Sequence, residues 1–190
     1  MTTIIVVKKN GCASIAADTL TKFGSSKESS EYIVNHEKIL KYRENYLAMT
    51  GWGSSQAALE NFLGRTKRKI SFDSVEDIFQ AGLLIHKELK DKYFLRPDDE
   101  SSDSFETSRA DILIANRFGI FALTAYRYVQ EFSRFYSYGS GNEYAMGAMF
   151  TVYNDKDKTA EDIARIGIQA AAEFDDGTAL PMNLYTVKLK

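Results

Sequence analysis

The chain has 190 residues, of which 44% are hydrophobic and 26% are charged, and its formal net charge is -2 at pH 7. This length and composition predict one folded domain over residues 1–190 and exclude disorder over most of the chain. The near-neutral charge argues against a nucleic-acid partner, because such binding requires many phosphate-neutralising Lys and Arg side chains.

Cysteine and histidine are too few for a disulfide framework or a zinc site. The chain has one cysteine, Cys12, and two histidines, His36 and His86, which lie far apart. An intramolecular disulfide is therefore excluded, and no paired metal-ligand spacing exists. The apolar run Ile4–Val7 is too short for a signal peptide, and no run is long enough to cross a membrane. We expect a cytoplasmic protein with no membrane partner.

The first third of the chain reads as two hairpins. TIIVVKK and CASIAAD flank Asn10-Gly11, the strongest short hairpin signal, because both turn residues must accept positive φ. The polar stretch Lys22–Glu31 is predicted as a loop or a mobile extension of the second strand. KILKY (Lys38–Tyr42) and YLAMT (Tyr46–Thr50) are predicted as the second hairpin.

Two helices follow. The first is expected over Ser55–Arg68, and Ser74 with Asp77 marks the start of the second, in which apolar residues recur with a helical period. His86 lies in this second helix and is interpreted as an ordinary helix residue. The acidic segment Arg96–Ser108 is interpreted as a solvated connection.

The second half repeats the pattern of strands and helices. ADILIAN and GIFALTA form two strands joined by Arg117-Phe118. The aromatic stretch Tyr126–Tyr136 reads as extended, and serves either a subunit contact or the core. GSGNEYAMGAMF leads through a glycine-bounded turn into a third helix, Thr159 caps a fourth that ends near Phe174, and NLYTVKLK is the last strand. This order predicts an α+β fold of four layers, with two antiparallel sheets face to face and helix pairs outside.

Thr2 permits two interpretations. It is either the frayed start of the first strand or, after removal of Met1, an N-terminal nucleophile whose own α-amino group is the base. The second interpretation needs a cation, a carboxylate to hold that cation, and a backbone N–H for the oxyanion. Lys38, Asp18 and Gly51 are candidates, although each could also be a solvated lysine, a turn residue or a helix-start turn.

Five segments together resemble the proteasome β-type subunits. TTIIVVKKNG…IAAD, HEKIL, MTGWGSSQA, YGSGNEYAMGAM and AAEFDDGT occur in the order in which that family carries its active-site segments. The likeness covers nearly the whole length and is strongest to the short bacterial branch typified by the HslV peptidase. It implies the four-layer αββα sandwich of N-terminal nucleophile hydrolases and a threonine endopeptidase activity that depends on removal of Met1.

The resemblance also assigns roles to individual residues. It implies Thr2 as nucleophile, Asp18 and Lys38 as the carboxylate and the lysine that tune it, and Gly51 as the oxyanion glycine. Ser140, Asp175 and Thr178 resemble the group near the terminal amine, with threonine at a position that is often serine in proteasomes. For substrate contacts it implies Leu20, Lys22, Met49 and Gly53, with Met49 either at the base of the side-chain pocket or filling core.

The resemblance implies stacked rings of identical subunits, polypeptide substrates and a partner AAA+ unfoldase. It indicates no required cofactor and no metal ligand, although a structural monovalent or divalent cation would be compatible with it. The polar segment Phe23–Asn35 is longer than in HslV, so it either shifts Lys38 away from Thr2 or forms a flexible element. Two alternatives remain open: a silent or Met1-blocked ring protein, and an N-terminal nucleophile amidase of a small molecule.

Overall fold

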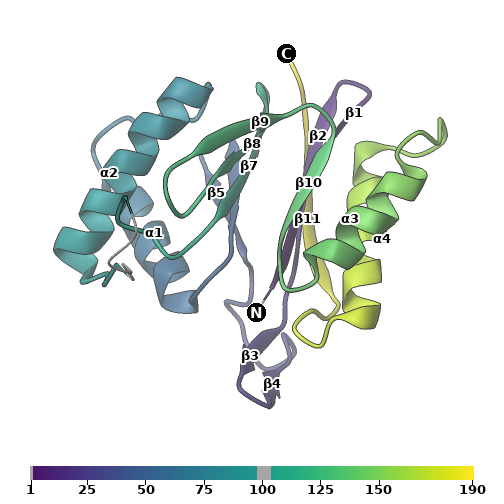
Figure 1. The fold of residues 1–190 in the computed structure, drawn as a ribbon, viewed down its shortest axis with the longest axis horizontal. Helices are drawn as coiled ribbons and strands as arrows, with labels where there is room; N and C mark the ends of the chain where they lie inside the picture. The colour runs from purple at the N-terminus through teal and green to yellow at the C-terminus, as the bar shows by residue number, and fades with distance from the viewer. Residues whose placement is uncertain (1, 98–103) are drawn as a thin grey trace.

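Two antiparallel sheets lie face to face in the computed structural model, which describes residues 2–97 and 104–190 (Figure 1). One sheet has the strand order β10-β1-β2-β11 and the other has the order β5-β6-β7-β8-β9. The first comprises β1 (Thr3–Lys9), β2 (Cys12–Asp18), β10 (Phe135–Gly139) and β11 (Met182–Lys188). The second comprises β5 (Ile39–Tyr42), β6 (Asn45–Met49), β7 (Ile112–Asn116), β8 (Gly119–Leu123) and β9 (Val129–Phe132).

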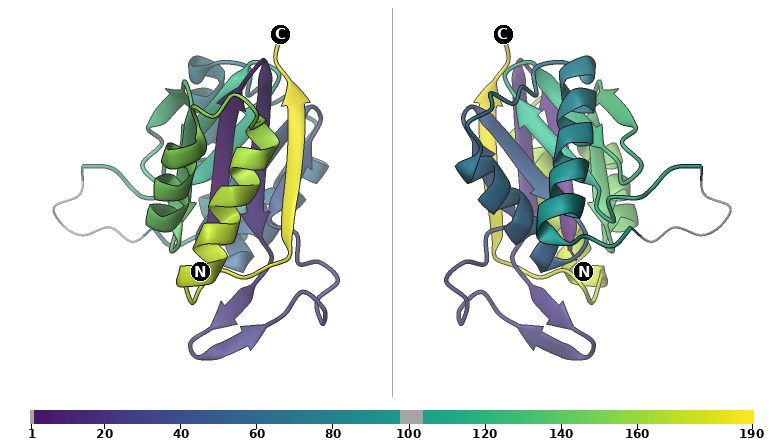
Figure 2. Two further views of the ribbon diagram at one scale, coloured as in Figure 1. Left: turned by 90° about the vertical axis from the view of Figure 1, so that its right-hand side faces the viewer. Right: turned by 90° about the vertical axis from the view of Figure 1, so that its left-hand side faces the viewer.

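A helix pair covers the outer face of each sheet (Figure 2). The sheet of β5–β9 carries α1 (Gly53–Arg65) and α2 (Val75–Tyr93), and the sheet that contains β1 carries α3 (Asn142–Val152) and α4 (Ala160–Phe174). The predicted αββα sandwich is therefore confirmed. The two caps are also confirmed, since Ser74 accepts the backbone N–H of Asp77 and Thr159 forms a capping box with Asp162.

Strand β1 is buried on both faces, as expected for a central strand of the sandwich. Ile4 and Val6 pack between the two sheets, whereas Ile5 and Val7 pack under α3 and α4. This alternation follows from the two-residue period of a β-strand. It also sends adjacent side chains at the start of the chain toward different layers.

Three predictions for connecting segments need correction. Lys22–Glu31, expected as a loop or a mobile extension of the second strand, overlaps a small separate hairpin of β3 (Thr21–Phe23) and β4 (Ser26–Glu28), which projects from the body (Figure 2). The stretch Tyr126–Tyr136 is not one extended segment, because β9 and the start of β10 belong to different sheets. Phe132 and Tyr136 stack with centroids 4.5 Å apart and pack against the core between the sheets.

The acidic segment Arg96–Ser108 lies partly outside the described residues. Within its described part, Glu106 is not simply solvated, because it forms an ion pair with Lys90 and a hydrogen bond with His86, both in α2. Ser108 also lies 2.9 Å from Nδ1 of His86, so this end of the segment is attached to the helix. No helix of the described chain is both long and apolar enough to cross a membrane.

Candidate active site

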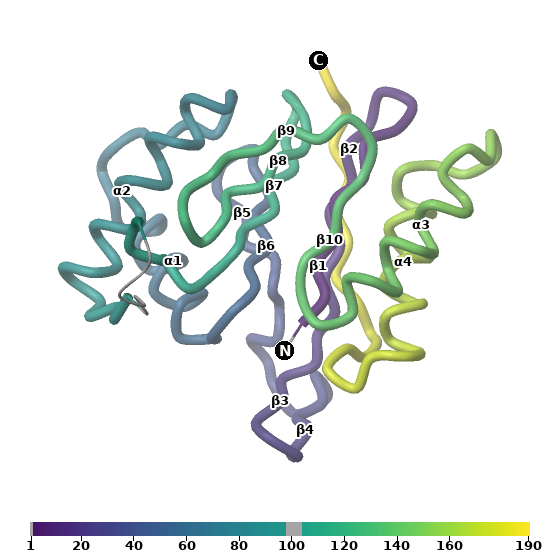
Figure 3. The backbone as a smooth tube through the Cα atoms, viewed as in Figure 1, coloured from purple at the N-terminus to yellow at the C-terminus, as the bar shows by residue number. Residues whose placement is uncertain are grey.

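Thr2 lies directly before β1, at the end of the sandwich where β2 leads toward the β3–β4 hairpin (Figure 3). Its side chain is buried, with 5% of the residue exposed. The Thr2 hydroxyl donates a hydrogen bond of 2.7 Å to Oδ1 of Asp18. Thr2 is therefore an ordered part of the fold rather than a frayed strand end. Met1, whose removal the sequence predicts, lies outside the described residues.

The carboxylate of Asp18, at the end of β2, accepts four hydrogen bonds. Its Oδ1 accepts the Thr2 hydroxyl, the backbone N–H of Thr3 at 3.0 Å and the ammonium of Lys38 at 2.8 Å. Its Oδ2 accepts the backbone N–H of Leu20 at 3.0 Å. An ionised carboxylate is acceptor-only, so four donors suit it well. The carboxylate is fully buried and thus holds Lys38 and the Thr2 hydroxyl together.

Lys38 directly precedes β5, and its side chain is 12% exposed. Burial lowers the pKa of its ammonium below the ordinary value of 10.5, while the charge and the hydrogen bond of Asp18 act in the opposite direction. The long segment Phe23–Asn35 leaves Lys38 in contact with Asp18. Of the two outcomes expected for that segment, displacement of the lysine is therefore wrong in this structure.

Gly51 lies at the same end of the sheet as Lys38. Ile39, the first residue of β5, pairs with Ala48 near the end of β6, so Lys38 just before β5 and Gly51 just after β6 lie at the same end of this strand pair. Its φ is +104°, and a Cβ atom there would lie 2.8 Å from the carbonyl oxygen of Arg109. Only glycine fits this backbone, which turns between β6 and the start of α1.

Ser140, Asp175 and Thr178 form a second group next to Thr2. Hydroxyls of Ser140 and Thr178 donate to Oδ2 of Asp175 at 2.7 and 2.6 Å. The backbone N–H of Ser140 donates to the carbonyl oxygen of Thr2 at 2.9 Å. Gly139 permits this approach, because a Cβ there would lie 1.9 Å from the same oxygen. The three predicted residues therefore lie together, and Ser140 links them to the backbone of the candidate nucleophile.

The pKa of Asp175 reflects opposing influences. Desolvation by partial burial raises it, but the hydrogen bonds from Thr178, Ser140 and the Gly177 backbone, together with the charge of Lys22, hold it below the ordinary value of 3.8. Asp175 is therefore ionised at neutral pH and acts as the acceptor at the centre of this group.

The predicted substrate-contact residues occupy different environments. Leu20 and Met49 are buried, and Met49 packs in the core under α1 and α2. Lys22 is paired with Asp176, and Gly53 is the exposed first residue of α1. The position of Met49 favours its core interpretation, and its part in a side-chain pocket stays a prediction.

Sequence reasoning missed Thr3, whose hydroxyl lies 2.6 Å from that of Thr178. The signal was available in the threonine pair at the chain start, because adjacent residues of a strand point in opposite directions. The interpretation of His86 as an ordinary helix residue overlooked its contacts with Ser108 and Glu106. Those partners lie about twenty residues away, and no local pattern links them to the helix.

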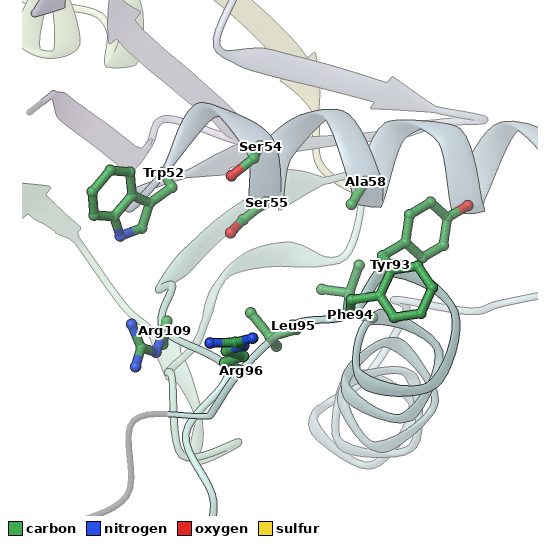
Figure 4. Close-up of a pocket in the computed structure, with 10 residues that line it drawn as sticks. Trp52, Ser54, Ser55, Ala58, Tyr93, Phe94, Leu95, Arg96 and Arg109 are labelled. Carbon is green, nitrogen blue, oxygen red and sulfur yellow. The ribbon is translucent and has the colours of Figure 1, made fainter. Parts of the chain in front are cut away.

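A pocket of about 210 Å³ lies between α1 and the end of α2 (Figure 4). Its walls include Trp52, Ser54, Ser55, Leu95, Arg96 and Arg109. Thr2, Asp18 and Lys38 do not line it, so it is distinct from the site of the candidate nucleophile. Among the residues that the structure describes, no cluster of His, Cys, Asp or Glu could hold a metal ion.

Comparison with known proteins finds close structural relatives over the whole chain. Thiobacillus denitrificans BPH is 44% identical, with a TM-score of 0.94, and the match covers 99% of this chain and 98% of that one. The same protein in complex with epoxomicin is 43% identical, with a TM-score of 0.93 and 99% of both chains covered. Eukaryotic HslV from Trypanosoma brucei shares the fold at 17% identity, with a TM-score of 0.68, 98% of this chain and 99% of that one. No protein-family model and no curated protein matches the chain.

Proposed function

The chain belongs to the HslV-like proteasome β-type family, and from that membership we propose that it is a threonine endopeptidase with Thr2 as nucleophile after removal of Met1. The observation that carries the proposal is the convergence of the Thr2 hydroxyl and the Lys38 ammonium on one oxygen of Asp18. A binding protein would not need a buried lysine and a buried carboxylate beside a threonine hydroxyl at the chain start. A threonine nucleophile requires them, because neighbouring charges must stabilise the negative charge that develops on its oxygen.

In the proposed reaction, Oγ1 of Thr2 attacks the carbonyl carbon of the scissile peptide bond. The hydroxyl proton passes, through a water molecule, to the free α-amine of Thr2. The C–N bond then breaks, and the departing amine takes that proton. A water molecule hydrolyses the remaining ester and regenerates the hydroxyl. Removal of Met1 is essential, because an amide nitrogen at Thr2 could not serve as the base.

The surrounding residues stabilise the charge that develops in this reaction. The ammonium of Lys38 lowers the free energy of the alkoxide at Thr2, and Asp18 keeps that ammonium in place. The backbone N–H of Gly51 is proposed as the donor to the oxyanion, at a turn whose shape only glycine allows. The Ser140–Asp175–Thr178 group fixes the carbonyl side of Thr2 through the Ser140 N–H.

We place the substrate polypeptide between two backbone edges. One edge is β3 with the preceding Leu20, and the other is Gly51–Gly53, so the peptide binds as an added strand. Lys22 and Met49 are the side chains expected to shape this site, and Gly53 leaves room for the peptide.

The proposed working form is a stack of rings of identical subunits in the cytoplasm, supplied with unfolded substrates by an AAA+ ATPase. A closed ring removes the need for specificity in the subunit itself, because it controls access to the nucleophile by enclosure. No cofactor is needed for the proposed chemistry, and a bound monovalent or divalent cation would serve structure only. Size-exclusion chromatography with light scattering tests the assembly.

The intact mass of the natively purified protein tests the nucleophile, with and without a peptide epoxyketone. We expect the loss of one methionine and one inhibitor adduct per chain, because this inhibitor class reacts with the hydroxyl and the amine of an N-terminal nucleophile together. The matched control is Thr2→Ala, which should neither bind covalently nor cleave a fluorogenic peptide.

Other outcomes identify the alternatives. If methionine is retained and no adduct forms, treatment with a methionine aminopeptidase separates a blocked enzyme from a silent ring protein. A monomer that labels at Thr2 but cleaves no peptide would indicate a small-molecule amidase. If Thr2→Ala cleaves peptide as fast as the wild type, the proposed nucleophile is wrong.

A further inference from the structure

Thr3 sits next to the proposed nucleophile, yet its side chain belongs to another layer of the fold. Thr2 binds Asp18, whereas the fully buried Thr3 hydroxyl lies between the start of α3 and the segment after α4. The alternation along β1 is the reason, because Ile5 and Val7, which share the parity of Thr3, pack under α3 and α4. Thr3 is therefore not positioned as a reserve nucleophile.

The directions of the hydrogen bonds at Thr3 follow from counting protons. Thr178 has one hydroxyl proton and donates it to the carboxylate of Asp175 at 2.6 Å. The 2.6 Å contact between the hydroxyls of Thr3 and Thr178 must then be donated by Thr3. Thr3 in turn accepts the backbone N–H of Gly141 at 3.1 Å. One directed chain therefore runs from Gly141 through Thr3 and Thr178 to Asp175.

This chain of hydrogen bonds ties two separate segments to the first strand. Gly141 precedes α3, Asp175 and Thr178 follow α4, and Thr3 begins β1. The fit around Thr3 is close, because a Cβ at Gly141 would lie 2.6 Å from its Oγ1. The same two outer segments also hold Ser140, which binds both Asp175 and the carbonyl oxygen of Thr2.

We infer that Thr3 is a positioning residue of the peptidase, whose hydroxyl fixes the Ser140–Asp175–Thr178 group relative to the nucleophile; this inference rests on the proposed function. Without that hydroxyl, the Gly141 N–H loses its acceptor and Thr178 loses the donor that orients it. Buried polar groups without partners are costly, so the two segments are expected to shift to satisfy them. The position of the Thr2 carbonyl would shift with them.

Two variants of Thr3 separate the hydroxyl from the packing of the side chain. Thr3→Val keeps the shape and removes the hydroxyl, whereas Thr3→Ser keeps the hydroxyl and removes the methyl group. We expect Thr3→Val to lower kcat by about 10- to 100-fold with little change in KM, because small misplacements of reacting groups have effects of this size. Thr3→Ser should retain activity within about threefold of the wild type, since it offers the same donor and acceptor.

The control breaks another hydroxyl pair of the same sheet. Ser14, which is buried, and Thr186, which is exposed, are joined at 2.8 Å between β2 and β11, so Thr186→Val measures the effect of losing a partly buried hydroxyl bond outside the site. Equal losses in Thr3→Val and Thr186→Val would overturn the inference, as would equal losses in Thr3→Val and Thr3→Ser, or full activity in Thr3→Val. If Thr3→Val does not fold, Thr3→Cys replaces it. A thiol is a weaker donor than a hydroxyl, so Thr3→Cys should also be less active than Thr3→Ser.

Hydrogen exchange measured by mass spectrometry provides a readout that does not need activity. Thr3→Val should lose amide protection over residues 139–142, while Thr3→Ser and Thr186→Val should keep it. A wild type that neither cleaves peptide nor labels at Thr2 after removal of Met1 would refute the proposed function. The exchange result would still decide whether Thr3 holds these segments, and unchanged protection in Thr3→Val would overturn that role.

Discussion

Lys38 donates to Asp18 across 2.8 Å in the interior of the protein, although twenty residues and a projecting hairpin separate them in the chain. The pair is more than a structural ion pair, because the oxygen that binds the ammonium also accepts the Thr2 hydroxyl. Burial disfavours charged groups, so two buried charges cost free energy of folding. A functional role explains why the protein keeps them. We interpret this purpose as control of the charge on the threonine oxygen.

Replacing Lys38 should lower both the activity and the stability of the protein. Lys38→Met removes the cation and should lower kcat by at least about 10²-fold, the usual range for loss of a group that controls proton transfer. It also leaves the buried Asp18 without its counter-charge, at a cost of about 3–5 kcal/mol in the free energy of unfolding. Peptide hydrolysis and thermal denaturation measure the two effects.

The control for this variant is Lys41→Met, three residues further along the chain in β5, where the lysine is exposed. It should be active and as stable as the wild type. The double variant Asp18→Asn/Lys38→Met should be more stable than Lys38→Met, because it removes the uncompensated charge. Normal turnover in Lys38→Met would show that Lys38 has no role in the chemistry.

The lowered pKa of Lys38 predicts opposite pH trends for activity and stability. If the protonated lysine is the active form, kcat/KM should fall as pH rises through this pKa, and the fall should begin below pH 10.5. The folded state binds the Lys38 proton less tightly than the unfolded state does, so the contribution of this group to stability is unfavourable at lower pH. That penalty disappears as pH rises toward 10.5.

Activity and melting temperature of the assembled protein should be recorded in parallel between about pH 7 and pH 10.5, the ordinary pKa of lysine. Size-exclusion chromatography at each pH confirms that the assembly persists. Activity that stays constant up to pH 10.5 would contradict the requirement for a protonated Lys38.

Local signals in the sequence were sufficient for much of the fold. Asn10-Gly11 predicted the first hairpin, and both residues have positive φ, while Ser74 and Thr159 cap helices as expected. These features depend on a few neighbouring residues. The β3–β4 hairpin was not predicted, because its short polar strands carry no hydrophobic alternation and join neither main sheet.

Only part of the candidate site could be predicted from the chemistry of individual residues. Thr2, Asp18 and Lys38 were suggested by the chemistry of an N-terminal nucleophile, but the roles of Ser140, Asp175 and Thr178 came only from family resemblance. Their meeting depends on how α3 and α4 pack on β1, and no pattern within one segment encodes it. Thr3 escaped notice for this reason, since its partners are 138 and 175 residues away.

Gly51 should not tolerate a side chain. Gly51→Ala places a Cβ 2.8 Å from the Arg109 carbonyl oxygen at a φ of +104°, so the turn must move. Moving the proposed oxyanion donor should lower kcat by about 10²- to 10³-fold, as for loss of one such donor elsewhere. The control is Gly64→Ala in α1, where a Cβ meets no atom within 4 Å. It should leave activity intact and raise stability by up to about 1 kcal/mol. An active Gly51→Ala would exclude Gly51 as the donor.

Changing Asp175 to asparagine should lower activity much more than the same change at its neighbour Asp176. Asp175 accepts two hydroxyls and the Gly177 N–H, and an amide offers one acceptor oxygen in place of two. Asp175→Asn should therefore lower kcat by about 10- to 100-fold, because the Ser140 side of Thr2 loses its anchor. Asp176 is exposed and pairs with the largely buried Lys22, and the amide oxygen of an asparagine can still accept from that ammonium, so Asp176→Asn should leave kcat much closer to the wild type than Asp175→Asn does.

The lowered pKa of Asp175 adds a pH signature that sets the two variants apart. Stability from an ionised carboxylate is fully present above its ordinary pKa of 3.8 and is lost as pH falls through the lower pKa of the folded state. The difference in melting temperature between wild type and Asp175→Asn should therefore shrink below pH 3.8. At neutral pH, the melting temperature of Asp176→Asn should stay close to that of the wild type. A difference that stays constant in acid would mean that the ionised form of Asp175 does not stabilise this group.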